Sequence, residues 1–369
     1  MSSSFFTQIG SDIDGVAGYE TNHLVSLSSD GSTVAIGVQG DFGSGQVRIF
    51  KNVNNTWTQV GSYIEGKAYD STGRSVSLSA DGSIIAIGAP YGDGGNVKIY
   101  KNLNNTWTQL GSDVNGTNGF GSSVSISADG SIIAIGNRWH DNTVSIPYIN
   151  GRNRGQVKIY KNVNNTWTQI GSNINGEAAG DQSGSSVSIS ADGSIVAIGA
   201  EWNDNENGSD SGHVRIYRNA NNSWIQIGNA INGADGFDLS GNSISLSSDG
   251  SIVAIGAWNK SSNGPYKGHV RIYRNVNNSW IQIGSDIDGE ADHDHSGYSV
   301  SLSADGNILA IGAKYNDNEN GIDSGHVRIY RNVNNSWIQI GSDIDGEAAG
   351  DRSGTAVSLS ADGSTVAIS

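Results

Sequence analysis

The sequence contains no cysteine and only 3 prolines among 369 residues. The absence of cysteine excludes disulfides, thiol catalysis and cysteine–zinc sites. Basic residues are also few, since 21 Lys and Arg stand against 36 Asp and Glu, for a net charge of −15. Binding to phosphate backbones needs a basic surface, so we expect no nucleic-acid partner. No apolar run reaches the length of a membrane span, and we therefore expect no membrane insertion.

Glycine is abundant, with 52 residues, and it recurs within a unit of roughly 50 to 60 residues that repeats from end to end. A clean copy extends from Ser186 to Gly233. It reads SVSISADGSIVAIGA, then a variable stretch, then GHVRIYRNANNSWIQIGNAING. Self-similarity of this kind is typical of repeat architectures, which close into one structure. We therefore expect one domain over residues 1–369 rather than the two or three that length alone suggests.

Each unit contains four runs with the character of β-strands. Val187 and Ile189 alternate with small serines, which would suit a crowded position near an axis, and the next run, from Ile195, is apolar on both faces. The third run begins at His213 and the fourth at Trp224. Four antiparallel strands joined by short turns fit a propeller blade. An Asp-Gly turn, typical of tight hairpins, separates the first two runs at Asp30, Asp81, Asp129, Asp192, Asp249, Asp305 and Asp362.

The predicted fold class is all-β, a seven-bladed β-propeller of four-stranded antiparallel blades. Blades 1 to 6 span about residues 21–346. The closing blade takes its first two strands from residues 354–369 and its fourth from residues 5–13, so the two termini share it. It lacks a third strand, because that sequence occurs only six times. We expect residues 1–13 to shift inward and pair with the second strand. Two alternatives are a strand from another molecule, which would cause self-association, and a chain that continues past Ser369.

The repeated pattern SGxSVSxSxDGSxxAIGA, followed by GxVRIY, resembles the FG-GAP repeats of integrin α-subunit propellers. Phe-Gly is present at Phe120-Gly121, and Gly-Ala-Pro at Gly88-Ala89-Pro90. The resemblance covers nearly the whole chain and implies a propeller with an extracellular binding or adhesion role. It also implies an extracellular or cell-surface location, although Met1 to Phe6 lacks the basic and apolar regions of a signal peptide. Propellers of the integrin type hold calcium between the first two strands, where this chain has a single aspartate per turn.

The primary functional prediction is a non-enzymatic extracellular binding or adhesion module. Its ligand, a protein or a glycan, is expected on the face formed by the variable loops between strands 2 and 3 and between blades. Lectin-like carbohydrate binding through loop aromatics is one alternative, and packing of those rings over neighbouring loops is the simpler interpretation. The candidate ligand-binding residues are Tyr91, Trp139, His140, Trp202, Trp258 and Tyr315.

Carboxylates on the same face suggest two further possibilities. A hydrolase could use pairs such as Glu177 with Asp181, but the recurrence of this pair in several blades favours a structural turn. The loops from Asp204 and from Asp317 alternate oxygen-bearing side chains around a glycine, as Ca²⁺ loops do. An Asx-rich turn is the other interpretation of these loops. No cofactor is required; if Ca²⁺ binds, its candidate ligands are Asp204, Glu206, Asp210, Asp317, Glu319 and Asp323.

Overall fold

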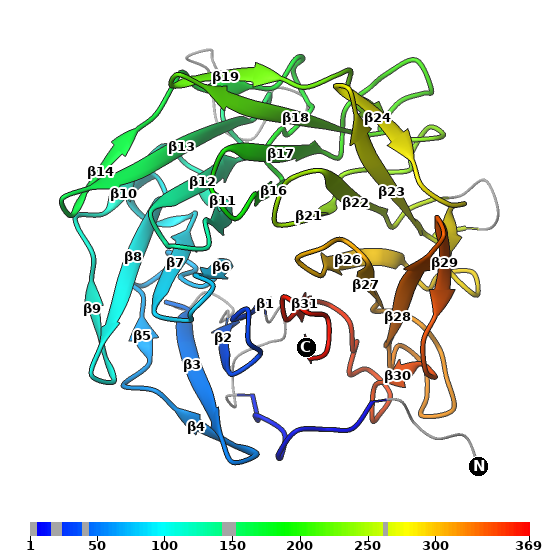
Figure 1. Cartoon of the computed structure of the whole chain (residues 1–369), viewed down its shortest axis with the longest axis horizontal. Coiled ribbons are helices and arrows are strands. Elements are labelled where there is room, and N and C mark those ends of the chain that lie inside the picture. The colour runs from blue at the N-terminus through cyan, green and yellow to red at the C-terminus, as the bar shows by residue number, and fades with distance from the viewer. Residues whose placement is uncertain (1–5, 16–23, 39–43, 142–152, 261–264) are drawn as a thin grey trace.

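The computed structural model describes residues 6–15, 24–38, 44–141, 153–260 and 265–369, which form a ring of β-sheets around a central axis (Figure 1). These residues contain six five-stranded sheets and one two-stranded sheet. One short 3₁₀ helix, η1 (Gly92–Gly94), lies in a loop. No helix in the described ranges is long and apolar enough to cross a membrane.

The strands follow the repeat. The first strands of the sheets are β1 (Leu24–Leu27), β6 (Ser75–Leu78), β11 (Phe120–Ile126), β16 (Ser186–Ile189), β21 (Ser243–Leu246), β26 (Ser296–Leu302) and β31 (Val357–Leu359). The second strands are β2 (Thr33–Val38), β7 (Ile84–Ala89), β12 (Ile132–Asn137), β17 (Ile195–Ala200), β22 (Ile252–Ala257), β27 (Ile308–Ala313) and β32 (Val366–Ile368). The third strands are β3 (Gln46–Val53), β8 (Asn96–Leu103), β13 (Gln156–Val163), β18 (His213–Ala220), β23 (His269–Val276) and β28 (His326–Val333).

The fourth strand of each blade is divided into two pieces, which both pair with the third strand. The longer pieces are β4 (Thr56–Gln59), β9 (Thr106–Gln109), β14 (Thr166–Gln169), β19 (Ser223–Gln226), β24 (Ser279–Gln282) and β29 (Ser336–Gln339). The shorter pieces are β5 (Ile64–Glu65), β10 (Val114–Asn115), β15 (Ile174–Asn175), β20 (Ile231–Asn232), β25 (Ile287–Asp288) and β30 (Ile344–Asp345).

The interruption of the fourth strand lies where the next blade docks. In the blade of β16–β20, the Ile227 carbonyl accepts a hydrogen bond from Nε1 of Trp280, in the following blade, at 2.9 Å. Gly228 then has φ of +69°, and a Cβ there would approach the Asn278 carbonyl oxygen to 2.6 Å. The strand therefore has to break to admit the tryptophan. The corresponding tryptophans also donate their indole N–H to a backbone carbonyl of the preceding segment: Trp57 to Ile9, Trp107 to Val60, Trp167 to Leu110, Trp224 to Ile170 and Trp337 to Ile283.

The predicted Asp-Gly hairpins are confirmed, and the serines beside them do lie near the axis. Asp192 accepts hydrogen bonds from Ser190 Oγ at 2.7 Å and from the Ser194 N–H at 2.9 Å, which fixes the turn. Adjacent hairpins are joined by backbone hydrogen bonds. The bond from the Ala361 N–H to the Ser29 carbonyl, at 2.8 Å, closes the circle of seven hairpins. Serine hydroxyls form a second circle, which closes from Leu27 N–H to Ser358 Oγ at 3.0 Å.

The prediction of seven blades is wrong, because the structure has six. At the seventh position, β31 and β32 form a two-stranded sheet only, and no described residue supplies a third strand. Residues 6–15 contain no strand, and residue 5 of the predicted closing strand lies outside the described ranges. The expected inward shift is not seen in the described part of the segment, because residues 6–13 form no ladder with β32, and residues 1–5 lie outside the described ranges. The Trp57 indole N–H donates to the Ile9 carbonyl at 2.8 Å, and Ile13 shares a hydrophobic cluster with Ala367 of β32. Without a third strand between them, residues 6–15 and the β31–β32 sheet cannot be joined by one ladder of backbone hydrogen bonds.

Candidate functional site

Loops between strands 2 and 3 meet the connections between blades on one face of the ring. The Asn203 amide donates to Asp181 Oδ1 at 3.0 Å, which joins the β17–β18 loop to the preceding connection. Asp181 also accepts the N–H groups of Glu177 and Ala178 at 2.9 and 2.7 Å. The carboxylate is buried and closes a turn, so the structural interpretation of this acidic pair agrees with the geometry.

A groove of about 500 Å³ lies on this face, and it brings together three of the predicted residues, Trp202, Asp204 and Asp210. The connection from Ala178 to Gln182 and Asn153 form the rest of its lining. Trp202 is 39% exposed, which leaves part of its indole open to a ligand. Pockets that combine an aromatic surface with a few fixed polar groups are typical binding sites.

The two carboxylates of the groove differ in their environment. Asp204 Oδ1 accepts the backbone N–H of Asp210 at 2.9 Å, so this carboxylate closes its own loop. Partial burial, and then the negative charge of Asp204, raise the pKa of Asp210. Asn207 continues the same turn by donating from its amide to the Gly233 carbonyl at 2.6 Å. The loop is thus held by its own Asx side chains, as an Asx-rich turn would be.

The other predicted aromatics are packed against one another. Tyr91 and Trp139 lie with ring centroids 5.1 Å apart, and Arg138 covers Trp139 at 4.7 Å. His140, next along the chain, lies with Nδ1 3.4 Å from Thr117 Oγ1. None of these residues is part of the lining of the groove.

A second aromatic group is centred on His295. Its ring stacks on Trp258 at 4.7 Å and meets the edge of Tyr315 at 4.8 Å. Burial, and then the charge of Lys314, lower the pKa of His295 to about 4. Trp258 and Tyr315, which were predicted as ligand-binding residues, thus both contact one histidine.

The loop from Asp317 repeats the turn of the groove but not its open aromatic ring. The N–H of Asp323 donates to Asp317 Oδ1 at 2.9 Å, as in the first loop. Tyr315 occupies the position of Trp202 in the repeat, but Arg352 lies 5.1 Å from its ring centroid. Arg352 comes from the connection after this blade, where the blade of the groove has Leu239. Tyr315 is half-buried, whereas Trp202 is exposed.

Two carboxylate–histidine clusters that the sequence did not indicate lie closer to the blade edges. Among the described residues, His269 groups with Asp286 and Asp288, and Glu290 groups with His326 and Asp343, with potential ligand atoms within 4.8 Å. The calcium candidates in the two loops are not among these groups.

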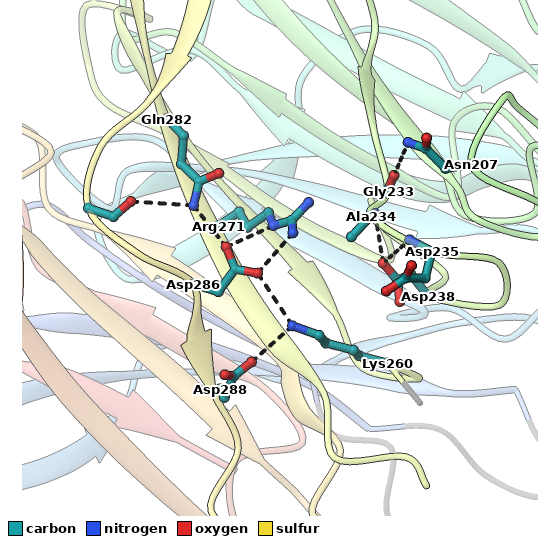
Figure 2. A network of polar contacts seen from close by, with 11 residues as sticks. Asn207, Gly233, Ala234, Asp235, Asp238, Lys260, Arg271, Gln282, Asp286 and Asp288 are labelled. Atoms are coloured by element: carbon teal, nitrogen blue, oxygen red, sulfur yellow. Dashed lines mark hydrogen bonds and ion pairs between the residues drawn. The ribbon is translucent and has the colours of Figure 1, made fainter. Parts of the chain in front are cut away.

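The cluster around Asp286 is already neutralised by cations of the protein (Figure 2). Arg271 donates to it through Nε and a terminal nitrogen, both at 2.9 Å. Lys260 bridges Asp286 and Asp288 at 3.3 and 3.1 Å. Burial opposes ionisation, but the hydrogen bonds from Arg271 and Gln282 hold the pKa of Asp286 well below its usual range. We interpret the cluster as a structural ion network rather than a metal site.

The position of this network follows from one substitution within the repeat. Arg215 and Arg328 pair with Glu177 and Glu290 of the preceding connections, at 3.5 and 3.4 Å. The corresponding connection has Ala234, which carries no charge. Arg271 therefore turns to Asp286 of its own blade. An alignment of the repeats against one another would have revealed this exchange.

Calcium binding at the two Asx loops stays a prediction, which chelation tests. A cation bound only by the folded state stabilises it, so EDTA should lower the melting temperature if Asp204–Asp210 or Asp317–Asp323 binds Ca²⁺. Calorimetry with and without EDTA measures the shift, and the double variant Asp204→Asn, Asp317→Asn should abolish it. An unchanged melting curve would leave the hydrogen-bonded turn as the role of these residues.

Comparisons with known proteins agree with the sequence and the fold. The FG-GAP repeat family model matches residues 175–217 and 286–330. No curated protein matches the chain significantly. Hydrazine synthase of Kuenenia stuttgartiensis is similar in structure, with a TM-score of 0.59, 13% identity, and 97% of this chain and 99% of that chain covered.

Two other solved structures show the same likeness. For the periplasmic gluconolactonase of Pseudomonas aeruginosa, the TM-score is 0.58, the identity 13%, and the coverage 91% of this chain and 88% of that one. A protein from Lactobacillus plantarum has a TM-score of 0.60 and 14% identity, with 96% of this chain and 90% of that chain covered. At such identities the likeness shows the fold alone. The repeats and the fold together support a binding-type β-propeller. The chain thus contains FG-GAP repeats within a β-propeller, which confirms the resemblance predicted from its sequence.

Proposed function

We propose that this chain is a non-enzymatic extracellular binding module that holds a glycan in the groove beside Trp202. The observation that carries the proposal is the exposed indole of Trp202 next to the carboxylates of Asp204 and Asp210 within one groove. The apolar face of a sugar ring stacks on an aromatic side chain, and sugar hydroxyls donate to carboxylates. The extracellular placement is based on the FG-GAP resemblance.

Catalysis by the same carboxylates is less well supported. A general base must be free to take a proton from the reacting group. Asp204 is occupied by the N–H of Asp210, and the same bond recurs between Asp317 and Asp323. Recurrence in two blades favours a turn element. The raised pKa of Asp210 is the observation on the side of a hydrolase, and the binding experiment below includes a test for cleavage.

A glycan array followed by titration of the best ligand tests the proposal. Trp202→Ala should weaken binding about tenfold or more, which corresponds to roughly 1.4 kcal/mol. Tyr315→Ala is the matched control, because this residue has the same position in the repeat but lies under Arg352. It should leave the affinity unchanged. Equal affinities of Trp202→Ala and the unmodified chain, or an array without any bound glycan, would contradict the proposal. If the chain released a shortened glycan, a hydrolase would replace the binding module as the proposed function.

A further inference from the structure

The cluster of His326, Glu290 and Asp343 brings together side chains from three separate segments. His326 begins β28 and lies opposite Asp345 of β30 in the ladder. Glu290 belongs to the connection between β25 and β26, and Asp343 directly precedes β30. One potential ligand atom from each of His326, Glu290 and Asp343 lies within 4.8 Å of the other two. One ring nitrogen and two carboxylate oxygens thus meet in one place.

The buried side chain of His326 has a polar group that faces this cluster without a hydrogen bond of ordinary length. His326 is 1% exposed, and among the described residues its Nε2 has no hydrogen-bond partner. Its Nδ1 lies 3.5 Å from Oδ2 of Asp343, whereas hydrogen-bonded N and O atoms are about 2.7–3.2 Å apart. Two ligands of one tetrahedral Zn²⁺ ion lie about 3.4 Å apart, because Zn–N and Zn–O bonds are each about 2.1 Å long. The observed separation therefore fits two ligands of one metal ion.

In the preceding blade, the corresponding aspartates are neutralised by cations of the protein (Figure 2). Nζ of Lys260 lies 3.3 Å from Asp286 and 3.1 Å from Asp288. Arg271 forms a second ion pair with Asp286, at 2.9 Å. Two positive charges thus balance two carboxylates, and the ammonium group of Lys260 lies between the two aspartates.

The blade of β26–β30 has the same pair of aspartates, Asp343 and Asp345, but a different balance of charge. Asn316 replaces the lysine of the preceding blade in the repeat. Arg328 pairs with Glu290, at 3.4 Å. In the part of the chain that the structure describes, neither aspartate forms an ion pair with a lysine or an arginine. Three carboxylates therefore surround one guanidinium group, and the excess of two negative charges equals the charge of a divalent cation.

We propose that His326, Asp343 and Glu290 bind a Zn²⁺ ion through one ring nitrogen and two carboxylate oxygens. Imidazole and carboxylate together are common ligands of this ion, whereas Ca²⁺ and Mg²⁺ prefer oxygen ligands alone. Nε2 of Gln339 donates to Oδ1 of Asp343 at 2.6 Å, and outer partners of this kind orient the ligands of metal sites. The ion would link β28 and β30 to the connection from the preceding blade.

Calorimetric titration of the metal-free chain with ZnCl₂ tests the proposal. We expect one saturable high-affinity site per chain and a higher melting temperature with Zn²⁺, because only the folded state brings the three ligands together. Asp343→Ala should weaken Zn²⁺ binding about 100-fold or more, since loss of a ligand costs more than loss of an outer partner. The blade of β16–β20 has Ala230 at this position, so the fold accepts alanine there.

Two histidine variants locate the site. His326→Gln should weaken Zn²⁺ binding as strongly as Asp343→Ala. His213→Gln is the matched control, because His213 has the same position in a repeat that contains Ala230 in place of the aspartate. This control should bind Zn²⁺ as the unmodified chain does. Circular dichroism and melting curves in EDTA establish that each variant is folded. Absence of Zn²⁺ binding to the unmodified chain, or equal affinities of His326→Gln and the unmodified chain, would overturn the proposal.

Discussion

Replacement of His213, His269 and His326 together by glutamine is expected to remove most of the loss of stability between pH 6.5 and about 4. Burial, and then nearby arginine or lysine charges, lower the pKa of His213 and His269 to about 3 and that of His326 to about 4. An unfolded histidine has a pKa of about 6.5. As the pH falls below that value, the unfolded state takes up protons that the folded state does not, so the free energy of unfolding decreases.

The size of this effect is large because all three histidines are almost fully buried. Each contributes on the order of 2 kcal/mol of destabilisation between pH 7 and pH 4. Glu177 lies 3.9 Å from Nδ1 of His213, which would favour a charged ring. Its carboxylate, however, is exposed and lies closer to Arg215, at 3.5 Å. Burial therefore dominates, and the histidine stays neutral in the folded state.

The repeats supply the replacement residue and an internal control. Gln46 and Gln156 occupy the same position in the first and third blades, so the fold accepts glutamine there. Urea denaturation at several pH values between 7 and 3 measures the effect. The triple variant should still lose stability below pH 4, because the aspartates of the seven hairpin turns are protonated there. Partial burial opposes ionisation of Asp192, but hydrogen bonds from Ser190 and Ser194 lower its pKa. The pKa of the aspartate is lowered in the six other turns as well. The prediction would be contradicted if the free energy of unfolding of the triple variant fell between pH 6.5 and 4 as steeply as that of the unmodified chain.

Gly199→Ala is expected to lower the free energy of unfolding by about 3 kcal/mol. A Cβ at Gly199 would lie 2.1 Å from the Gly241 carbonyl oxygen of the next blade and 2.3 Å from Ser186 Oγ. Backbone cannot move away as a flexible side chain can, so the two blades must separate. Other second strands have the same close contact, at Gly37, Gly88, Gly136, Gly256 and Gly312.

Gly350→Ala is the matched control for this substitution. Gly350 has φ of +84°, and no atom lies within 4 Å of the position that a Cβ would take there. The control therefore measures only conformational strain, about 1 kcal/mol for an alanine at positive φ. Urea midpoints of both variants give the comparison. Equal losses would show that the distance between blades does not restrict position 199.

Features within one repeat could be predicted from the sequence, and contacts between repeats mostly could not. The strand positions, the Asp192 type of turn and the small serine face of β16 depend on neighbours along the chain, which local patterns reveal. The blade count depends on whether a strand lies beside β32. A fragment such as residues 6–15 resembles a fourth strand, but it cannot form a ladder alone.

The candidate site divides in the same way. The sequence identified Trp202, Asp204 and Asp210, and the structure gathers them in one groove. It did not show that Tyr315 is covered, because that depends on Arg352 from a connection that meets its loop only in the folded ring.

The closed circles of hydrogen bonds at the inner hairpins have a consequence for how the sequence can vary. An open repeat array has terminal units, which need special polar capping sequences to shield an otherwise exposed interface. Here the bond from Ala361 to Ser29 gives every inner hairpin two neighbours. No inner hairpin is terminal, so none requires a cap. The same short Ser-x-Asp-Gly sequence can therefore serve at all seven positions, from Ser28 to Ser360.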